Sequence, residues 1–159
     1  MARDKQTRAG WPAAVSNHSP YPRVLLIEDN SGDIELLTIA FEMNNMNALI
    51  TTAEDGDQGL SALRSLTGRG ETPDLVLLDL NMPRRSGFEV LAALAEWPTP
   101  LVCPVVVWTS SFAAHDREHC LACGAVAFFT KPERISDYIK LVESLRPFLK
   151  GPPTAAAGG

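Results

Sequence analysis

The segment LVLLDLNMPRRSGFEVL, residues 75–91, combines an apolar run, an acidic residue, a turn and a helix start. The run at 75–78 is aliphatic throughout, which is typical of a strand buried on both faces of a parallel sheet. Asp79 follows the run directly, and a turn containing proline comes next. Ser86 precedes Glu89 by three residues, the spacing of a capping box. The segment therefore predicts a strand, a loop that opens with a carboxylate, and a helix.

Residues 24–149 repeat this order of short apolar run and helical period. Apolar residues with a 3.6-residue period follow the runs, most clearly from residue 135 to residue 149. A second capping-box spacing joins Asp55 to Gln58. Such strand–helix units predict an α/β fold with a doubly wound parallel sheet and helices on both faces. The expected strands cover 24–27, 49–53, 75–78, 105–108 and 126–129.

The two ends of the chain lack any apolar period, and we expect them to be flexible tails at 1–23 and 150–159. The domain between them, 24–149, has nine basic and eighteen acidic residues and thus a net charge of −9. This acidity argues against nucleic-acid binding. No apolar run approaches the roughly 18–20 residues of a membrane span, and the start of the chain does not resemble a signal peptide. We therefore expect a cytoplasmic protein that binds neither nucleic acid nor membranes.

Polar side chains follow four of the five predicted strands. They are Glu28 and Asp29 after the first strand, Asp79 after the third, Thr109 after the fourth and Lys131 after the fifth. The carboxyl ends of parallel strands form one crevice, so we expect these side chains to lie together. Three carboxylates in one place repel one another unless a cation or a proton intervenes, and oxygen ligands suit Mg²⁺. A lysine and a hydroxyl group at the same place can bind phosphate oxygens.

This combination predicts transfer of a phosphoryl group onto a carboxylate, with Mg²⁺ offsetting the negative charge. Asp79 is the candidate nucleophile because the most hydrophobic of the predicted strands holds it rigidly. The alternative is that these acids are solvated loop residues. The presence of suitable groups after four strands makes that alternative the weaker one.

These residues resemble the receiver domains of two-component response regulators. The resemblance covers 24–149 and rests on the Glu28-Asp29 pair, on LLDLNMPRRSGFEVL, on VVVWTSS around Thr109 and on Lys131-Pro132. It implies a flavodoxin-like sheet of five parallel strands in the order 2-1-3-4-5, with five helices. It also implies that the protein is not an enzyme.

The resemblance implies a role for each residue of the site. Asp79 would accept a phosphoryl group from a sensor histidine kinase. Glu28, Asp29, Asp79 and the main-chain carbonyl of Asn81 would hold Mg²⁺.

The resemblance also implies a switch. Lys131 would pair with the phosphoryl oxygens, and its bond to Pro132 is expected to be cis. Thr109 would move toward the phosphoryl group, and Phe128 would follow it inward as the aromatic switch residue. The protein would then signal through its changed surface.

Within the family, the chain resembles single-domain regulators that partner phytochrome-type histidine kinases. We expect no output domain after residue 149, an undefined downstream protein and, as one possibility, a homodimer through the fourth or fifth helix. Two other functions stay open: a small aspartyl-phosphate phosphatase, suggested by Asp79-Leu80-Asn81, and an interaction module that does not need phosphorylation.

Two other groups of residues have a functional and a structural interpretation. The Cys120-x-x-Cys123 motif and the nearby His115 and His119 are compatible with a metal or redox site, but packing and solvated surface are the favoured interpretation. The pair Arg84-Arg85 is compatible with kinase recognition, and a solvated loop pair is favoured.

Overall fold

Five parallel strands form one sheet in the computed structural model, which describes residues 20–149. The order β2-β1-β3-β4-β5 confirms the predicted doubly wound, flavodoxin-like topology. The strands are β1 (Arg23–Ile27), β2 (Leu49–Ala53), β3 (Leu75–Leu78), β4 (Val105–Thr109) and β5 (Ala127–Thr130). Of the tails predicted at 1–23 and 150–159, residues 1–19 and 150–159 lie outside the described residues, and Arg23 is the first residue of β1.

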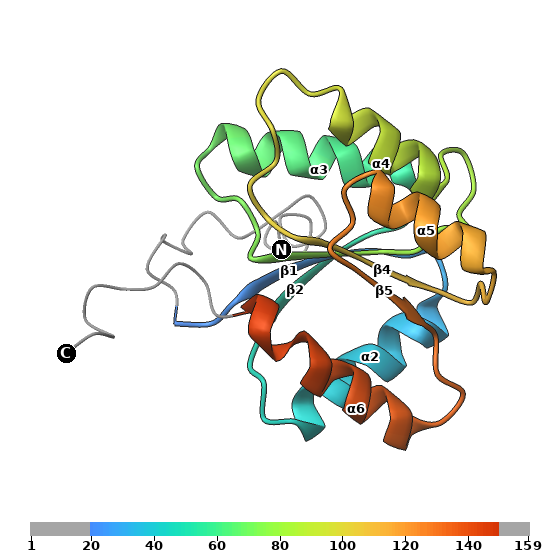
Figure 1. Cartoon of the computed structure of the whole chain (residues 1–159). Coiled ribbons are helices and arrows are strands. Elements are labelled where there is room, and N and C mark those ends of the chain that lie inside the picture. The colour runs from blue at the N-terminus through green and yellow to red at the C-terminus, as the bar shows by residue number, and fades with distance from the viewer. Residues whose placement is uncertain (1–19, 150–159) are drawn as a thin grey trace.

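Within residues 20–149, five α-helices cover the sheet, as predicted. They are α2 (Ser31–Met43), α3 (Gly56–Gly68), α4 (Gly87–Ala95), α5 (Ala114–Ala122) and α6 (Ile135–Leu145). Figure 1 shows α3, α4 and α5 on one face of the sheet and α2 and α6 on the other. A short 3-10 helix, Arg146–Leu149, follows α6. None of the helices within 20–149 is long and apolar enough to cross a membrane.

The central strands are buried on both faces because each face carries a helical layer. In β1, Leu25 and Ile27 pack toward α3, α4 and α5, whereas Val24 and Leu26 pack toward α2 and α6. Successive strand residues point to opposite faces, so a strand covered on both sides needs apolar residues at every position. This explains the continuous apolar runs in the sequence.

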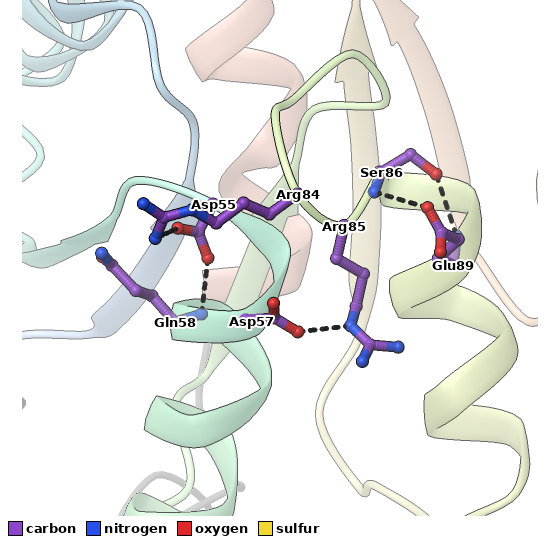
Figure 2. Close-up of polar contacts among 7 residues, drawn as sticks. All are labelled: Asp55, Asp57, Gln58, Arg84, Arg85, Ser86 and Glu89. Atoms are coloured by element: carbon purple, nitrogen blue, oxygen red, sulfur yellow. Dashed lines mark hydrogen bonds and ion pairs between the residues drawn. The ribbon is translucent and has the colours of Figure 1, made fainter.

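Polar side chains close the helix starts as the spacings predict. Asp55 Oδ1 accepts a hydrogen bond from Gln58 N at 2.8 Å. Ser86 and Glu89 form both bonds of a capping box at the start of α4, as Figure 2 shows. Each such cap satisfies backbone N–H groups that have no partner within the helix.

Two arginines tie the β3–α4 loop to the start of α3. Arg84 Nη1 lies 3.2 Å from Asp55 Oδ2, and Arg85 Nε lies 2.6 Å from Asp57 Oδ1 (Figure 2). Arg84 also has a positive φ of 65°, a left-handed conformation that is uncommon outside glycine. Both arginines therefore fix the loop after Asp79 against a neighbouring helix.

The close approach of this loop to α3 gives a stability prediction. A Cβ atom on Gly56 would lie 2.4 Å from the backbone oxygen of Arg85, whereas one on Gly68 would have nothing within 4 Å. We expect Gly56→Ala to lower the free energy of unfolding by about 1–3 kcal/mol, because the loop has to move. Gly68→Ala, in the same helix, should leave it unchanged or raise it by up to about 1 kcal/mol. Urea denaturation measures both, and equal effects would contradict the packing described.

Candidate functional site

The carboxyl ends of β1 and β3 bring the predicted acids together. Ile27 pairs with Leu78 in register, so Glu28 and Asp79 leave the sheet at the same level. The backbone N–H of Asp79 donates to the carbonyl of Ile27 at 3.0 Å, which fixes the start of the loop. Carboxylate oxygens of Glu28, Asp29 and Asp79 lie within 4.8 Å of one another. Glu28 and Asp79 are buried and Asp29 is exposed, so the cluster is open on one side.

Lys131 brings a positive charge into this cluster from the end of β5. Its Nζ lies 2.5 Å from Glu28 Oε1 and 2.8 Å from Asp33 Oδ2. Asp79 Oδ2 is farther away, at 3.7 Å. The Lys131 side chain is only 9% exposed, so these ion pairs form largely away from water. Lys131 thus links β5 to β1, β3 and α2 at one point.

Burial governs the protonation of this cluster. Desolvation raises the pKa of Glu28 to about 7, and the charge of Asp79 adds to the rise while Lys131 opposes it. Desolvation also raises the pKa of Asp79. For Lys131, burial lowers the pKa, but the hydrogen bonds to Asp33 and Glu28 outweigh it and the pKa is raised. The Lys131 ammonium therefore stays charged at neutral pH.

Asp79 has an unused acceptor at the centre of the site. Its Oδ1 is buried and has no hydrogen-bond partner within the described part of the chain. A buried polar atom without a partner is costly, and native structures contain few of them. Hard divalent cations prefer oxygen ligands, and Mg²⁺ takes one or two carboxylates together with other oxygens. The donor set of Glu28, Asp29 and Asp79 fits such an ion.

Thr109 lies at the carboxyl edge of the sheet, whereas Phe128 lies deeper within it. Thr109 ends β4, is fully buried, and accepts the backbone N–H of Lys131 on its carbonyl at 2.7 Å. Phe128 instead pairs with Val107 inside the sheet and packs in the core under α3, α4 and α5. Arg117 Nη1 of α5 donates to the Phe128 carbonyl at 3.1 Å. Of the two predicted switch residues, Thr109 therefore lies at the carboxyl edge of the sheet, and Phe128 lies in the core beneath the helices.

One predicted feature of the site is wrong. The Lys131–Pro132 bond is trans, since residues 20–149 contain no cis peptide bond. Trans is the lower-energy isomer before proline, by about 0.5–1 kcal/mol. The Lys131 side chain reaches its carboxylates with this isomer.

The cysteine and histidine residues of α5 do not form a metal cluster. Cys120 is buried, and burial raises the pKa of its thiol to about 11. Cys123 Sγ lies 3.7 Å from His119 Nε2. Within 20–149, the group Glu28-Asp29-Asp79 is the one set of three or more such side chains arranged to hold a metal ion. This agrees with the interpretation of the α5 residues as packing and surface.

Two neighbours of Lys131 were not found from the sequence. Asp33 lies in the first turn of α2, whereas the rule for parallel sheets predicts site residues only at the strand ends. Trp108 is fully buried in β4, and its ring lies under Lys131, with Nζ 4.8 Å from the ring centroid. The one available signal for Asp33 is its position as an acid in the helix turn that follows Glu28 and Asp29.

Comparison with known proteins identifies the class. Residues 24–143 match the profile of the response regulator receiver domain. Response regulator Rcp1 of Synechocystis sp. is 31% identical over 140 residues, which cover 84% of this chain and 93% of that protein. The chain belongs to the response regulator receiver domain family of two-component systems.

Solved structures of similar proteins agree with this assignment. The structure described as the phosphorylated cyanobacterial phytochrome response regulator RcpA has a TM-score of 0.73 and 31% identity, covering 84% of this chain and 97% of that one. The structure described as the Mn²⁺-bound form of Rcp1 has a TM-score of 0.69 and 29% identity, covering 83% and 97%. Both resemble this chain over nearly their whole length.

The raised pKa of Glu28 gives a pH prediction for the metal-free protein. Between pH 4.5, the ordinary value, and about pH 7, the folded state binds more protons than the unfolded state. The free energy of unfolding should therefore fall as pH rises through this window. Glu28→Gln should reduce the slope, whereas Glu35→Gln, a change on the exposed face of α2, should keep it. Urea denaturation at several pH values in the presence of a chelator measures the slope; a wild-type slope in Glu28→Gln would refute the assignment.

Proposed function

We propose that this protein is a phosphoacceptor response regulator whose Asp79 receives a phosphoryl group from a sensor histidine kinase. The observation that carries this proposal is the environment of Asp79. Its Oδ1 is buried without a hydrogen-bond partner, two further carboxylates lie beside it, and a charged lysine is 3.7 Å from its other oxygen. This is the arrangement that a carboxylate nucleophile with a divalent cation requires.

Glu28, Asp29, Asp79 and the main-chain carbonyl of Asn81 would hold Mg²⁺. The ion, when bound, offsets the charge of the carboxylates and of the phosphoryl oxygens. The similar structure described as the Mn²⁺-bound form of Rcp1 supports the proposal that a divalent cation binds here. The exposed position of Asp29 leaves the cluster open toward solvent, from where an ion and a phosphodonor enter.

In the proposed transfer of the phosphoryl group, Asp79 acts as the nucleophile, and Lys131 and Thr109 bind the phosphoryl oxygens. An oxygen of Asp79 attacks the phosphorus atom of the kinase's phosphohistidine, a P–O bond forms, and the P–N bond to the imidazole breaks. The leaving imidazole nitrogen keeps the electron pair and takes up a proton. Lys131 binds a phosphoryl oxygen as a fixed positive charge, and the Thr109 hydroxyl donates to another. Catalysis of this kind depends on positioning and electrostatic stabilisation.

Phosphorylation would shift the population between two states of the protein. We assign the switch to Thr109 and Phe128: a Thr109 side chain drawn toward the phosphoryl group leaves space that Phe128 enters. Phe128 is 7% exposed and its carbonyl is bound to Arg117 of α5. A shift of Phe128 therefore alters the surface formed by β5 and α5, through which the signal passes to a downstream protein.

A phytochrome-type histidine kinase is the proposed partner. The support is the similarity to the cyanobacterial phytochrome response regulator RcpA and to Rcp1 over most of their lengths. We expect the protein to act in the cytoplasm. We expect each molecule to accept one phosphoryl group rather than to turn over a substrate. A homodimer would form through α5 or α6 packing against the same helix of a second molecule.

The phosphoacceptor assignment is tested by labelling. With Mg²⁺ and acetyl phosphate, the wild-type chain should gain about one phosphoryl group, because one carboxylate acts as nucleophile. Asp79→Asn, or a chelator, should abolish the gain, while Glu42→Gln, a change at an exposed acid of α2, should keep it. Intact-protein mass spectrometry reads the mass change. Undiminished labelling of Asp79→Asn would disprove the assignment, and many turnovers of a small phosphoester would favour the phosphatase alternative.

The kinase assignment is tested separately by phosphotransfer. Purified phosphorylated kinases, phytochrome-type and others, are mixed with the chain, and the loss of label from each is followed over seconds to minutes. We expect phytochrome-type kinases to transfer at least about tenfold faster, since paired surfaces raise association rates by electrostatic and shape matching. Equal rates from unrelated kinases would contradict this partner and leave the phosphoacceptor role intact.

A further inference from the structure

Asp33 contacts Lys131 from a helix rather than from a strand end. Its Oδ2 is 2.8 Å from Lys131 Nζ, whereas Asp79 Oδ2 is 3.7 Å from the same atom. The Asn30 side chain caps the start of α2 by accepting from Asp33 N at 2.9 Å, so the backbone that carries Asp33 is fixed. The ammonium thus lies closer to Asp33 than to the carboxylate assigned above as phosphoacceptor.

Asp33 also lies outside the group that fits a metal ion. That group consists of Glu28, Asp29 and Asp79, whose oxygens gather within 4.8 Å. A cation held there competes with Lys131 for Glu28 but leaves the charge of Asp33 unchanged. Asp33 therefore remains a partner for the ammonium in the metal-loaded protein, and a phosphoryl group on Asp79 becomes its rival.

Trp108 lies close enough to the Lys131 ammonium for its fluorescence to depend on the position of that group. Lys131 Nζ is 4.8 Å from the centroid of the Trp108 ring, within the range of a cation–π contact. Trp108 is fully buried, and its ring meets Tyr138 of α6 edge-on at 6.2 Å. A displacement of Lys131 therefore changes the environment of a buried indole.

We propose that Asp33 is a positioning residue that holds Lys131 in the unphosphorylated protein and competes with the phosphoryl group for its ammonium. The proposal rests on the phosphoacceptor role of Asp79. A contact that exists in only one of two states stabilises that state. Asp33 therefore weakens binding of a phosphoryl group at Asp79, and its neutralisation strengthens that binding.

Beryllofluoride, an anion that imitates a phosphoryl group on a carboxylate, tests this competition without chemistry. Isothermal titration calorimetry in Mg²⁺ measures its affinity for the wild-type chain and for Asp33→Asn, which keeps the size of the side chain and removes its charge. We expect about three- to tenfold tighter binding by Asp33→Asn, the range for a partly exposed charged contact. Asp33→Glu, which restores the charge, and Glu35→Gln on the same helix should stay within about twofold of wild type.

Trp108 fluorescence supplies a readout that a purely structural role of Asp33 would not change. In a chain with Trp11→Phe and Trp97→Phe, Trp108 is the remaining tryptophan. Beryllofluoride should change its emission as Lys131 leaves the ring. With Asp33→Asn added, the emission before titration should already lie toward the bound value, so the change should be smaller.

The results distinguish a failure of the phosphoacceptor role of Asp79 from a failure of the positioning role of Asp33. If the wild-type chain does not bind beryllofluoride, the phosphoacceptor role fails and the role of Asp33 fails with it. If the wild-type chain binds and Asp33→Asn binds equally or more weakly, or shows the full emission change, the role of Asp33 alone is overturned. Circular dichroism checks that Asp33→Asn is folded, and Asp33→Ser replaces it as the uncharged variant if it is not.

Discussion

Lys131 carries the positive charge on which the carboxyl edge of this sheet depends. Parallel strands place their carboxyl ends together, and here that rule brings Glu28 and Asp79 side by side in a buried position. Burial removes hydration from both carboxylates and raises the pKa of each, and the charge of Asp79 raises the pKa of Glu28 further. The Lys131 ammonium pairs with these carboxylates, and the oxygens of Glu28, Asp29 and Asp79 lie close enough together to fit a further cation.

The structure around this edge is held by contacts on each side. The apolar β3 strand is buried on both faces and fixes Asp79. Arg84 and Arg85 tie the loop beyond it to the start of α3. Asp33 and the ring of Trp108 both contact the ammonium of Lys131. Few parts of a site held in this way can adjust independently of one another.

The fold was predictable because each of its signals is local. Continuous apolar runs gave the five strands to within one residue at each end, and the spacings from Asp55 to Gln58 and from Ser86 to Glu89 gave two helix starts. The convergence of Glu28, Asp29, Asp79 and Lys131 followed from the rule for parallel sheets. The trans bond before Pro132 did not follow, because both isomers are compatible with the local sequence.

Residue types and their order along the chain thus specified the class of fold, the edge that carries the acids and the family to which the protein belongs. Packing in three dimensions decided which partner each charge has. Four such contacts connect residues that are 23 to 98 positions apart in the sequence and lie on different elements. They are the contacts of Lys131 with Asp33 and with the Trp108 ring, and the ion pairs of Arg84 and Arg85. Periodicity and spacing report local geometry and burial, whereas such contacts depend on how separate elements are oriented when the chain is folded.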